Sequence, residues 1–485
     1  MEQYGTRCED HSVSEAFWPW LIRALAMPAL LATPVRAAGG APLRASRLTQ
    51  EARAKLILLL GASGLREDDA ERARFSDGHG LADLLRRRLG DVSLAPDGVL
   101  YPRNAADVQG LLTLCAELDL AVCIGSAGAD VLRERARPAL ALDLSGLGHI
   151  LARDQLSGLM EVEAGIGAAE LERQLKAQGL TLGTTFETSL GGWIASAATM
   201  PEPVQSVTVA TPRGTLHLDK GLHHVMAGSR GRLGAITSAR LRVRPPPEDA
   251  LCCAYLFSDF AAGLTVLREV VRRGIPHDRL LLLDDGATRL ERALVRHNWN
   301  LPERFYDVWR ALRGFNTGAA RLIVNFSGNA AQRKLARKNF QALARRLGHF
   351  SLGAATLGPP YPRDALLDRG VGMDRLQFSA TWSELPLLYA RLRSALTRAM
   401  RAHPALPGAQ GLVLTRIDDA RSDGASVTIT WLFARKLEDE VAQATAIRHA
   451  ALAASGIGTR PALEQDMLDA IKRSLDPKNT VAPSA

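Results

Sequence analysis

The stretch FETSLGGWIASAATMPEPVQS, residues 186–206, places two adjacent glycines and a tryptophan ahead of a run of small residues and two prolines. Glycine has no Cβ, so Gly191 and Gly192 allow another group to approach the backbone closely. Proline cannot continue a sheet ladder, so Pro201 and Pro203 delay the next strand. The stretch therefore predicts a tight, glycine-rich bend that enters a strand through a short, stiff connection.

The composition of the whole chain is that of a globular protein with several domains. Its 485 residues exceed one compact core, and 47% hydrophobic and 23% charged residues are ordinary values. The net charge is +9, but the arginines are spread along the chain and aromatic residues make up only 5%. We therefore expect no nucleic-acid partner. The five cysteines lack metal-ligand spacing, which predicts buried thiols in a reducing cytoplasm and no metal site.

The N-terminal residues 1–48 are expected to form an irregular arm. Residues 16–38 are apolar, but acidic residues precede them, and Arg23 and several prolines interrupt them. This pattern is atypical of a signal peptide or a membrane span. A peripheral contact of the arm with a lipid surface or a partner subunit, including a homodimer, stays open. The expected location is cytoplasmic.

The rest of the chain divides into four further regions by its pattern of apolar and polar residues. Residues 49–98 read as helical, and 99–247 alternate between strands and helices. Within the latter, VQSVTVATPRGTLHLD (204–219) reads as a hairpin whose turn is PRG. The prolines at 245–247 predict a domain boundary. Residues 248–440 read as a second unit of mixed strands and helices, and 441–485 as a closing helical segment that returns to the first domain.

The usual short catalytic motifs are missing from the sequence. It contains no GxxxxGK[ST] loop, HExxH, GxSxG or paired CxxC. Glycine-rich segments occur instead, in a fixed order: DGVLYPRNAADVQGLLTLCAEL (97–118), EVEAGIGAAELERQLKAQGLTLG (161–183), TSLGGWIASAA (188–198), SVTVATPRG (206–214) and AGSRGRLGAITSARLRVRPPP (227–247).

This order resembles the FAD-binding domain of the vanillyl-alcohol-oxidase/PCMH superfamily. The C-terminal strings ATWSELPLLYARLRSAL (380–396) and IKRSLDPKNTVAP (471–483) are similar to bacterial FAD-linked oxidases of the alkyldihydroxyacetonephosphate synthase branch. The resemblance implies an α+β fold: a PCMH-type FAD-binding domain of two α+β subdomains over 99–247, followed by a cap domain with an antiparallel sheet flanked by helices.

The resemblance also implies FAD as the cofactor, with its pyrophosphate against backbone N–H groups in glycine turns. The implied contact residues form three groups, one after a core strand, one in the opening bend and one in a later turn. They are Gly125, Ser126, Gly128 and Ala129; Thr188, Ser189, Gly191, Gly192 and Trp193; and Gly231, Leu233, Gly234 and Ile236.

Several positions depart from the pattern of the family. Ser126 and Ala127 replace two glycines of the first loop, and the connection 196–203 is several residues short. Residues 453–465 contain no histidine where the synthase branch has a histidine-rich run. No catalytic residue is identified, and Arg416 and Arg460 are candidates for binding a small anionic substrate. Two hypotheses follow: an FAD-dependent oxidoreductase or synthase-like enzyme, or a catalytically inactive member acting as a binding or scaffold subunit.

Overall fold

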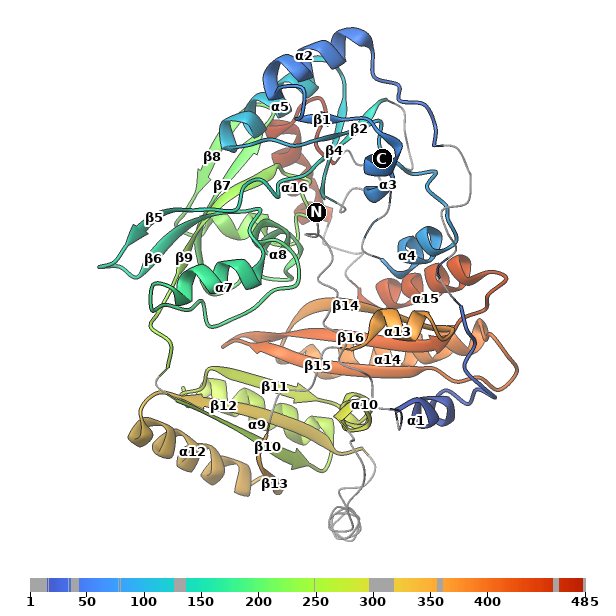
Figure 1. The fold of residues 1–485 in the computed structure, drawn as a ribbon. Coiled ribbons are helices and arrows are strands. Elements are labelled where there is room, and N and C mark those ends of the chain that lie inside the picture. Colours follow the sequence, from blue (N-terminus) through green and yellow to red (C-terminus); the bar gives the residue numbers. More distant parts are fainter. Residues whose placement is uncertain are drawn as a thin grey trace. The chain divides into compact units, whose positions relative to one another are not determined.

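The chain forms two compact units in a computed structural model (Figure 1). The residues it describes are 15, 17–33, 35, 43–76, 78, 80–125, 137–247, 249–295, 318–355, 361–456 and 462–482. The two-sheet unit comprises Val35–Pro246 with Thr459–Ala485, and the seven-strand unit comprises Met1–Pro34 with Pro247–Gly458. The division at residues 246 and 247 falls inside the proline run 245–247.

The first sheet of the two-sheet unit has the strand order β1-β2-β4-β3. Its last three strands run parallel to one another, and β1 is antiparallel to β2. Asn104 caps α5 because its side chain accepts a hydrogen bond from the Asp107 N–H at 2.8 Å. The elements are β1 (Leu65–Arg66), β2 (Gly98–Leu100), β3 (Ala121–Ile124), β4 (Ala139–Leu142), α2 (Gln50–Leu60), α3 (Asp69–Arg74), α4 (Leu81–Arg88) and α5 (Ala105–Glu117).

The second sheet of this unit is antiparallel, in the order β5-β6-β9-β7-β8. The turn between Thr211 and Gly214 closes the hairpin of β7 and β8, as the sequence TPRG predicts. Helices α7, α8 and α16 pack their apolar side chains against its core. The elements are β5 (Ile150–Asp154), β6 (Leu159–Glu163), β7 (Val204–Thr211), β8 (Gly214–Leu218), β9 (Ala235–Arg242), α7 (Ala168–Lys176), α8 (Leu190–Ser196), η2 (Leu222–Met226) and α16 (Ala462–Leu475).

The seven-strand unit is built on one antiparallel sheet in the order β13-β10-β12-β11-β15-β16-β14. Leu282 faces α9, whereas its neighbours Leu281 and Leu283 pack with α1 and α10, so helices cover both faces. The strands are β10 (Ala250–Phe257), β11 (Arg279–Leu283), β12 (Ala320–Ser327), β13 (His349–Ala354), β14 (Val371–Thr381), β15 (Leu412–Ala420) and β16 (Gly424–Ala434). The helices are α1 (Phe17–Ala24), α9 (Phe260–Arg272), α10 (Asp285–Val295), α12 (Ala330–Arg345), α13 (Arg363–Leu367), α14 (Leu385–Ala402) and α15 (Glu440–Ser455).

The N-terminal arm differs from the irregular segment that the sequence predicts, because it contains helix α1. The side chains of Phe17, Leu21 and Leu25 are fully buried in the core of the seven-strand unit. Farther along, the Thr33 N–H donates to the Asp368 carbonyl at 2.8 Å. The apolar side chains that suggested a peripheral contact are therefore used inside the chain's own core.

The C-terminal region is divided between the two units. Helix α15 belongs to the seven-strand unit, whereas α16 and the residues after it belong to the two-sheet unit. No helix in the described residues is both long and apolar enough to cross a bilayer. Nor do the described residues contain a group of three or more histidine, cysteine or acidic side chains placed to hold a metal ion.

Candidate functional site

The glycine-rich bend forms the start of helix α8, and its backbone donors are already engaged. Ser189 is the N-cap, and its hydroxyl accepts a hydrogen bond from the Gly192 N–H at 3.2 Å. The Leu190, Gly191 and Trp193 N–H groups donate to the carbonyls of Ile166, Ala164 and Ser189, respectively, at 2.7–2.9 Å. Thr188 is exposed and Trp193 half-buried, so at residues 190–193 a ligand would meet side chains rather than free N–H groups.

Close packing explains why glycine is required at this bend. A Cβ on Gly191 would lie 3.1 Å from the Ala164 Cβ and 3.2 Å from the Ala164 carbonyl oxygen. A Cβ on Gly192 would lie 3.1 Å from the Thr188 hydroxyl oxygen. The first glycine lets α8 sit directly against the chain after β6, so it serves helix packing whether or not a ligand is bound.

The turn at residues 227–234 contains the third group of implied contact residues, and we call it the third loop. It contacts the segments that hold the other two groups. A Cβ on Gly231 would lie 3.3 Å from the Ile124 Cδ1 atom, and Ile124 directly precedes Gly125. The Arg230 N–H donates to the Ala195 carbonyl at 2.9 Å, which ties the loop to α8. The structure thus brings Gly125, the bend and the third loop together. Ser126, Gly128 and Ala129 lie outside the described residues.

Backbone conformation and burial decide what the third loop can offer a ligand. Gly231 has φ +80° and Gly234 has φ +141°, conformations that side chains other than glycine rarely adopt. The side chains of Leu233 and Ile236 are buried in the core of the unit. These two residues can therefore contact a ligand through their backbone only.

Unpartnered buried donors gather at the third loop. The hydroxyl of Ser229 is buried and has no hydrogen-bond partner among the described residues, and the same holds for the Arg232 Nε and the Thr480 hydroxyl. The Gly231 and Leu233 N–H groups donate to nothing within the described ranges either. Buried polar groups in native proteins are nearly always hydrogen-bonded, so this loop is prepared for an acceptor-rich ligand.

A second cluster of charged side chains lies on the sheet of the seven-strand unit. The register pairs Leu283 with Arg321 on one side and Arg416 on the other, which places both guanidinium groups on one face. The Arg416 Nη2 lies 2.6 Å from an Asp418 carboxylate oxygen, and the Arg321 Nη1 lies 3.4 Å from Glu291. Arg460 lies outside the described residues.

Shifts in pKa show how strongly these charges interact. Burial raises the pKa of the Glu291 carboxyl, although Arg321 and Arg416 oppose the shift. Burial and the nearby Arg416 lower the pKa of Arg279. Burial disfavours the charged form of Arg416, but Asp418, with Tyr361 and Glu291, outweighs burial and raises the pKa of Arg416. We call these three arginines with Glu291 and Asp418 the arginine cluster; it carries more positive than negative groups and suits an anion.

Sequence reasoning missed most of these residues. Ser229 lies within GSRGRLG, whose glycines mark the turn, so a serine between glycines was an available signal; the same motif offered Arg232 as a group that could neutralise phosphate or simply be exposed. Arg279, Arg321 and Glu291 have no such signal, because strand register and a packed helix bring them together from separate segments.

Two family models match this chain. Residues 96–218 match the FAD binding domain, and residues 246–460 match the C-terminal domain of FAD linked oxidases. Alkyldihydroxyacetonephosphate synthase from Dictyostelium discoideum is 24% identical over 413 residues. That match covers 77% of this chain and 66% of the relative, just under two thirds of its length.

Solved structures show the same fold. An alkyldihydroxyacetonephosphate synthase superposes with a TM-score of 0.78 at 21% identity, covering 97% of this chain and 91% of that one. A substrate-bound p-cresol methylhydroxylase has a TM-score of 0.64 at 14% identity, covering 90% of this chain and 97% of that one.

The chain therefore belongs to the FAD-linked oxidases, with an FAD binding domain and the C-terminal domain of that family, and it has the PCMH-type fold. Among these proteins it resembles the alkyldihydroxyacetonephosphate synthase branch. The resemblance predicted from the glycine-rich segments is confirmed, as are the α+β fold class and membership of a family whose cofactor is FAD.

The residues of the third loop fit this cofactor. A pyrophosphate has only acceptor oxygens, and the loop presents a buried hydroxyl at Ser229, free N–H groups at Gly231 and Leu233, and the cationic Arg232. The bend fits less well, because the N–H groups of residues 190–193 are engaged within the chain. The third loop is therefore the part of the site best suited to hold the pyrophosphate.

Proposed function

We propose that this protein is an FAD-dependent enzyme acting on a small anionic substrate. The observation that carries the proposal is the buried Ser229 hydroxyl without a partner among the described residues, beside the Gly231 and Leu233 N–H groups of the third loop, in a chain whose residues 96–218 match the FAD binding domain. When bound, FAD supplies a flavin ring that accepts electrons or forms bonds to substrate. The third loop holds the pyrophosphate, and the Arg416 guanidinium orients a substrate carboxylate or phosphate.

Two anionic substrate classes fit the arginine cluster. One is a substituted dihydroxyacetone phosphate, in line with the name of the alkyldihydroxyacetonephosphate synthase relatives. The other is a 2-hydroxy acid, because D-lactate dehydrogenases are also similar to this chain, at 25% identity over 243 residues for the protein from Kluyveromyces lactis. Both present an anion that a guanidinium can bind through two hydrogen bonds.

Flavin binding is tested on the purified full-length protein by its visible spectrum and by titration with FAD. Ser229→Ala removes one hydrogen bond to a charged group, worth about 1.5–3 kcal/mol, so the Kd for FAD should rise about 10- to 100-fold. The matched control is Ser157→Ala, in an exposed turn of the same unit, which should leave the Kd unchanged. Equal Kd values for wild type and Ser229→Ala would contradict this role of the loop.

Substrate binding is tested by bleaching of the bound flavin with each substrate class under anaerobic conditions. Arg416→Gln should raise the concentration needed for half-maximal bleaching at least tenfold and leave the Kd for FAD unchanged. Arg273→Gln is the control, because Arg273 caps the C-terminus of α9 and its ion pair among the described residues is with Glu269 of that helix. Bleaching that is unaffected by Arg416→Gln would exclude Arg416 from the substrate site.

The second candidate function is that of a catalytically inactive family member acting as a binding or scaffold subunit. The engaged N–H groups of the bend favour it, as does the lack of histidine in residues 453–465. Saturating FAD, at about a hundred times its Kd, should add ~2.7 kcal/mol to the stability of a flavin-binding protein. A colourless protein that FAD does not stabilise would support this second candidate and refute the first.

We also propose a cytoplasmic location, a homodimer as the assembly and no nucleic-acid partner. The thiols of Cys115, Cys252 and Cys253, which form no disulfide among the described residues, support a reducing compartment. Sedimentation of the purified protein tests the dimer.

A further inference from the structure

The residues after helix α16 complete the first sheet of the two-sheet unit. The Val122 N–H donates to the Thr480 carbonyl, and the Ala482 N–H donates to the Val122 carbonyl, each at 2.8 Å. Val122 and Val481 thereby pair in parallel. Strand β3 is the edge of its sheet in the order β1-β2-β4-β3, so the segment 480–482 covers that edge. The same strand leads directly into Gly125.

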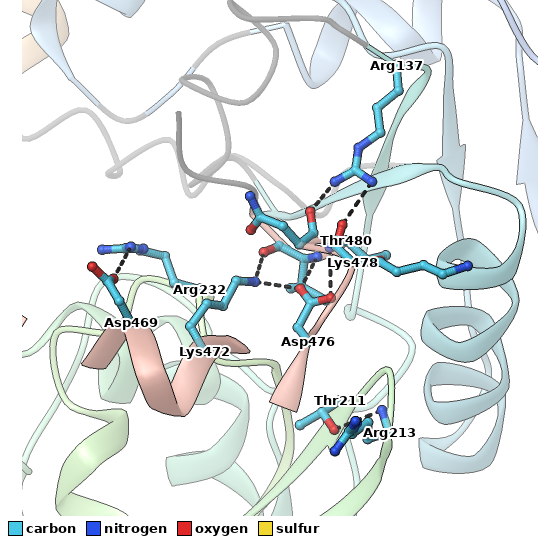
Figure 2. A network of polar contacts seen from close by, with 11 residues as sticks. Arg137, Thr211, Arg213, Arg232, Asp469, Lys472, Asp476, Lys478 and Thr480 are labelled. Atoms are coloured by element: carbon cyan, nitrogen blue, oxygen red, sulfur yellow. Dashed lines mark hydrogen bonds and ion pairs between the residues drawn. The ribbon is translucent and has the colours of Figure 1, made fainter. Parts of the chain in front are cut away.

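A buried ion pair holds this segment in place (Figure 2). One oxygen of the Asp476 carboxylate accepts the Thr480 N–H at 2.8 Å, and the other accepts the Val481 N–H at 2.7 Å. The Lys472 ammonium donates to Asp476 and to the Val481 carbonyl, each at 2.5 Å. Both side chains are almost fully buried. Burial lowers the pKa of Lys472, and Arg232 and Arg137 contribute, so several positive charges converge here.

The same region also reaches the third loop. The Arg232 Nη2 lies 3.4 Å from the carboxylate of Asp469, one turn before Lys472 on α16 (Figure 2). From the other side, Arg137, two residues before β4, donates to the Lys478 carbonyl at 3.1 Å and to the Asn479 carbonyl. The segment from helix α16 to residue 482 therefore contacts both β3 and the third loop. Strand β3 leads into Gly125, and the third loop contains Gly231.

We propose that Asp476 and Lys472 form a C-terminal clamp that positions the end of β3 and the third loop for flavin, so that flavin binds only when the clamp is closed. The inference rests on the proposed FAD binding. Neither side chain needs to touch the cofactor, and both act as positioning residues. Flavin in turn should hold the clamp closed, because binding and closure are linked.

The test uses the full-length protein and the variant Asp476→Asn, which removes the charge that binds Lys472. In the absence of flavin, hydrogen exchange at residues 121–125 should be at least tenfold faster in the variant than in the wild type. The Kd for FAD should rise at least tenfold. In the wild type, FAD should slow the exchange of the Val122 and Val481 N–H groups. Lys472→Met, which keeps the carboxylate bonds to Thr480 and Val481, should show the same changes to a smaller degree and serves if Asp476→Asn does not fold.

The matched control is Glu440→Gln, which disrupts the buried Arg435–Glu440 ion pair of 2.6 Å in the seven-strand unit. It should lower the melting temperature without changing the Kd for FAD or the exchange at residues 121–125. Unchanged exchange at 121–125 in Asp476→Asn, or a Kd for FAD equal to that of the wild type, would overturn the clamp. A wild type that does not bind FAD would instead refute the proposed function, while the exchange comparison still decides whether the clamp holds β3.

Discussion

Replacing Gly234 with alanine should destabilise the two-sheet unit far more than the same change at Gly214. The two glycines have nearly equal φ angles, +141° and +145°, in a region that alanine rarely adopts, so backbone strain is expected at both. Their surroundings differ. A Cβ on Gly234 would lie 2.6 Å from the Ala210 carbonyl oxygen and 2.8 Å from the Val209 Cγ1, whereas a Cβ on Gly214 has nothing within 4 Å. The pair therefore separates backbone strain from packing.

The expected magnitudes follow from these two terms. Strain at such a φ costs about 1–3 kcal/mol at either position. Overpacking adds about 1–3 kcal/mol at Gly234 alone, because the Ala210 carbonyl belongs to strand β7 and cannot move without breaking its ladder. For a unit of this size, that difference lowers the melting temperature of Gly234→Ala by about 2–12 °C relative to Gly214→Ala.

Differential scanning calorimetry of both variants measures this difference directly. Titration with FAD adds a second readout, because Gly234 ends the third loop and Gly214 lies in a hairpin turn. Gly234→Ala should therefore also weaken FAD binding, and Gly214→Ala should not. Equal melting temperatures for the two variants would refute the packing argument, since only the neighbours of the new methyl group distinguish them.

Two further predictions concern the arm and a buried histidine. Leu21→Ala should lower the free energy of unfolding in urea by about 2–5 kcal/mol, because Leu21 is fully buried. Leu31→Ala, at a side chain that is 43% exposed, should lower it by about 1 kcal/mol or less. Equal losses would contradict burial of the arm. Burial lowers the pKa of His223 below its ordinary 6.5; His224 adds a smaller shift in the same direction, and Asp219 opposes both. The unfolded state therefore binds the proton more readily than the folded state. Stability should therefore fall as pH drops below about 6.5 in the wild type but less so in His223→Gln, and parallel pH profiles would contradict this shift.

The sequence was sufficient for features encoded by local residues. The turn TPRG predicted the hairpin between β7 and β8, and the glycines of GSRGRLG marked the third loop. Both depend on backbone angles that few residue types adopt, so residue identity alone reveals them.

Features that depend on distant partners could not be predicted in the same way. Leu21 lies in an apolar stretch, but the residues that bury it, including Leu290 and Leu414, come from far along the chain. The bend was expected to present free N–H groups, yet carbonyls of Ala164 and Ile166 accept them. Those acceptors come from the segment between β6 and α7, and only the folded sheet places them beside α8.

Coverage of the β3 edge by residues 480–482 has a consequence for synthesis. A ribosome adds about 5–20 residues per second, so roughly 20–70 s pass between the emergence of β3 and of the segment that pairs with it. During that time the nascent chain carries an unpaired strand edge, the kind of surface on which chains aggregate. A premature stop codon anywhere before residue 480 would leave that edge open for good, so the loss of a few C-terminal residues should make the translated chain a substrate for chaperones and proteases.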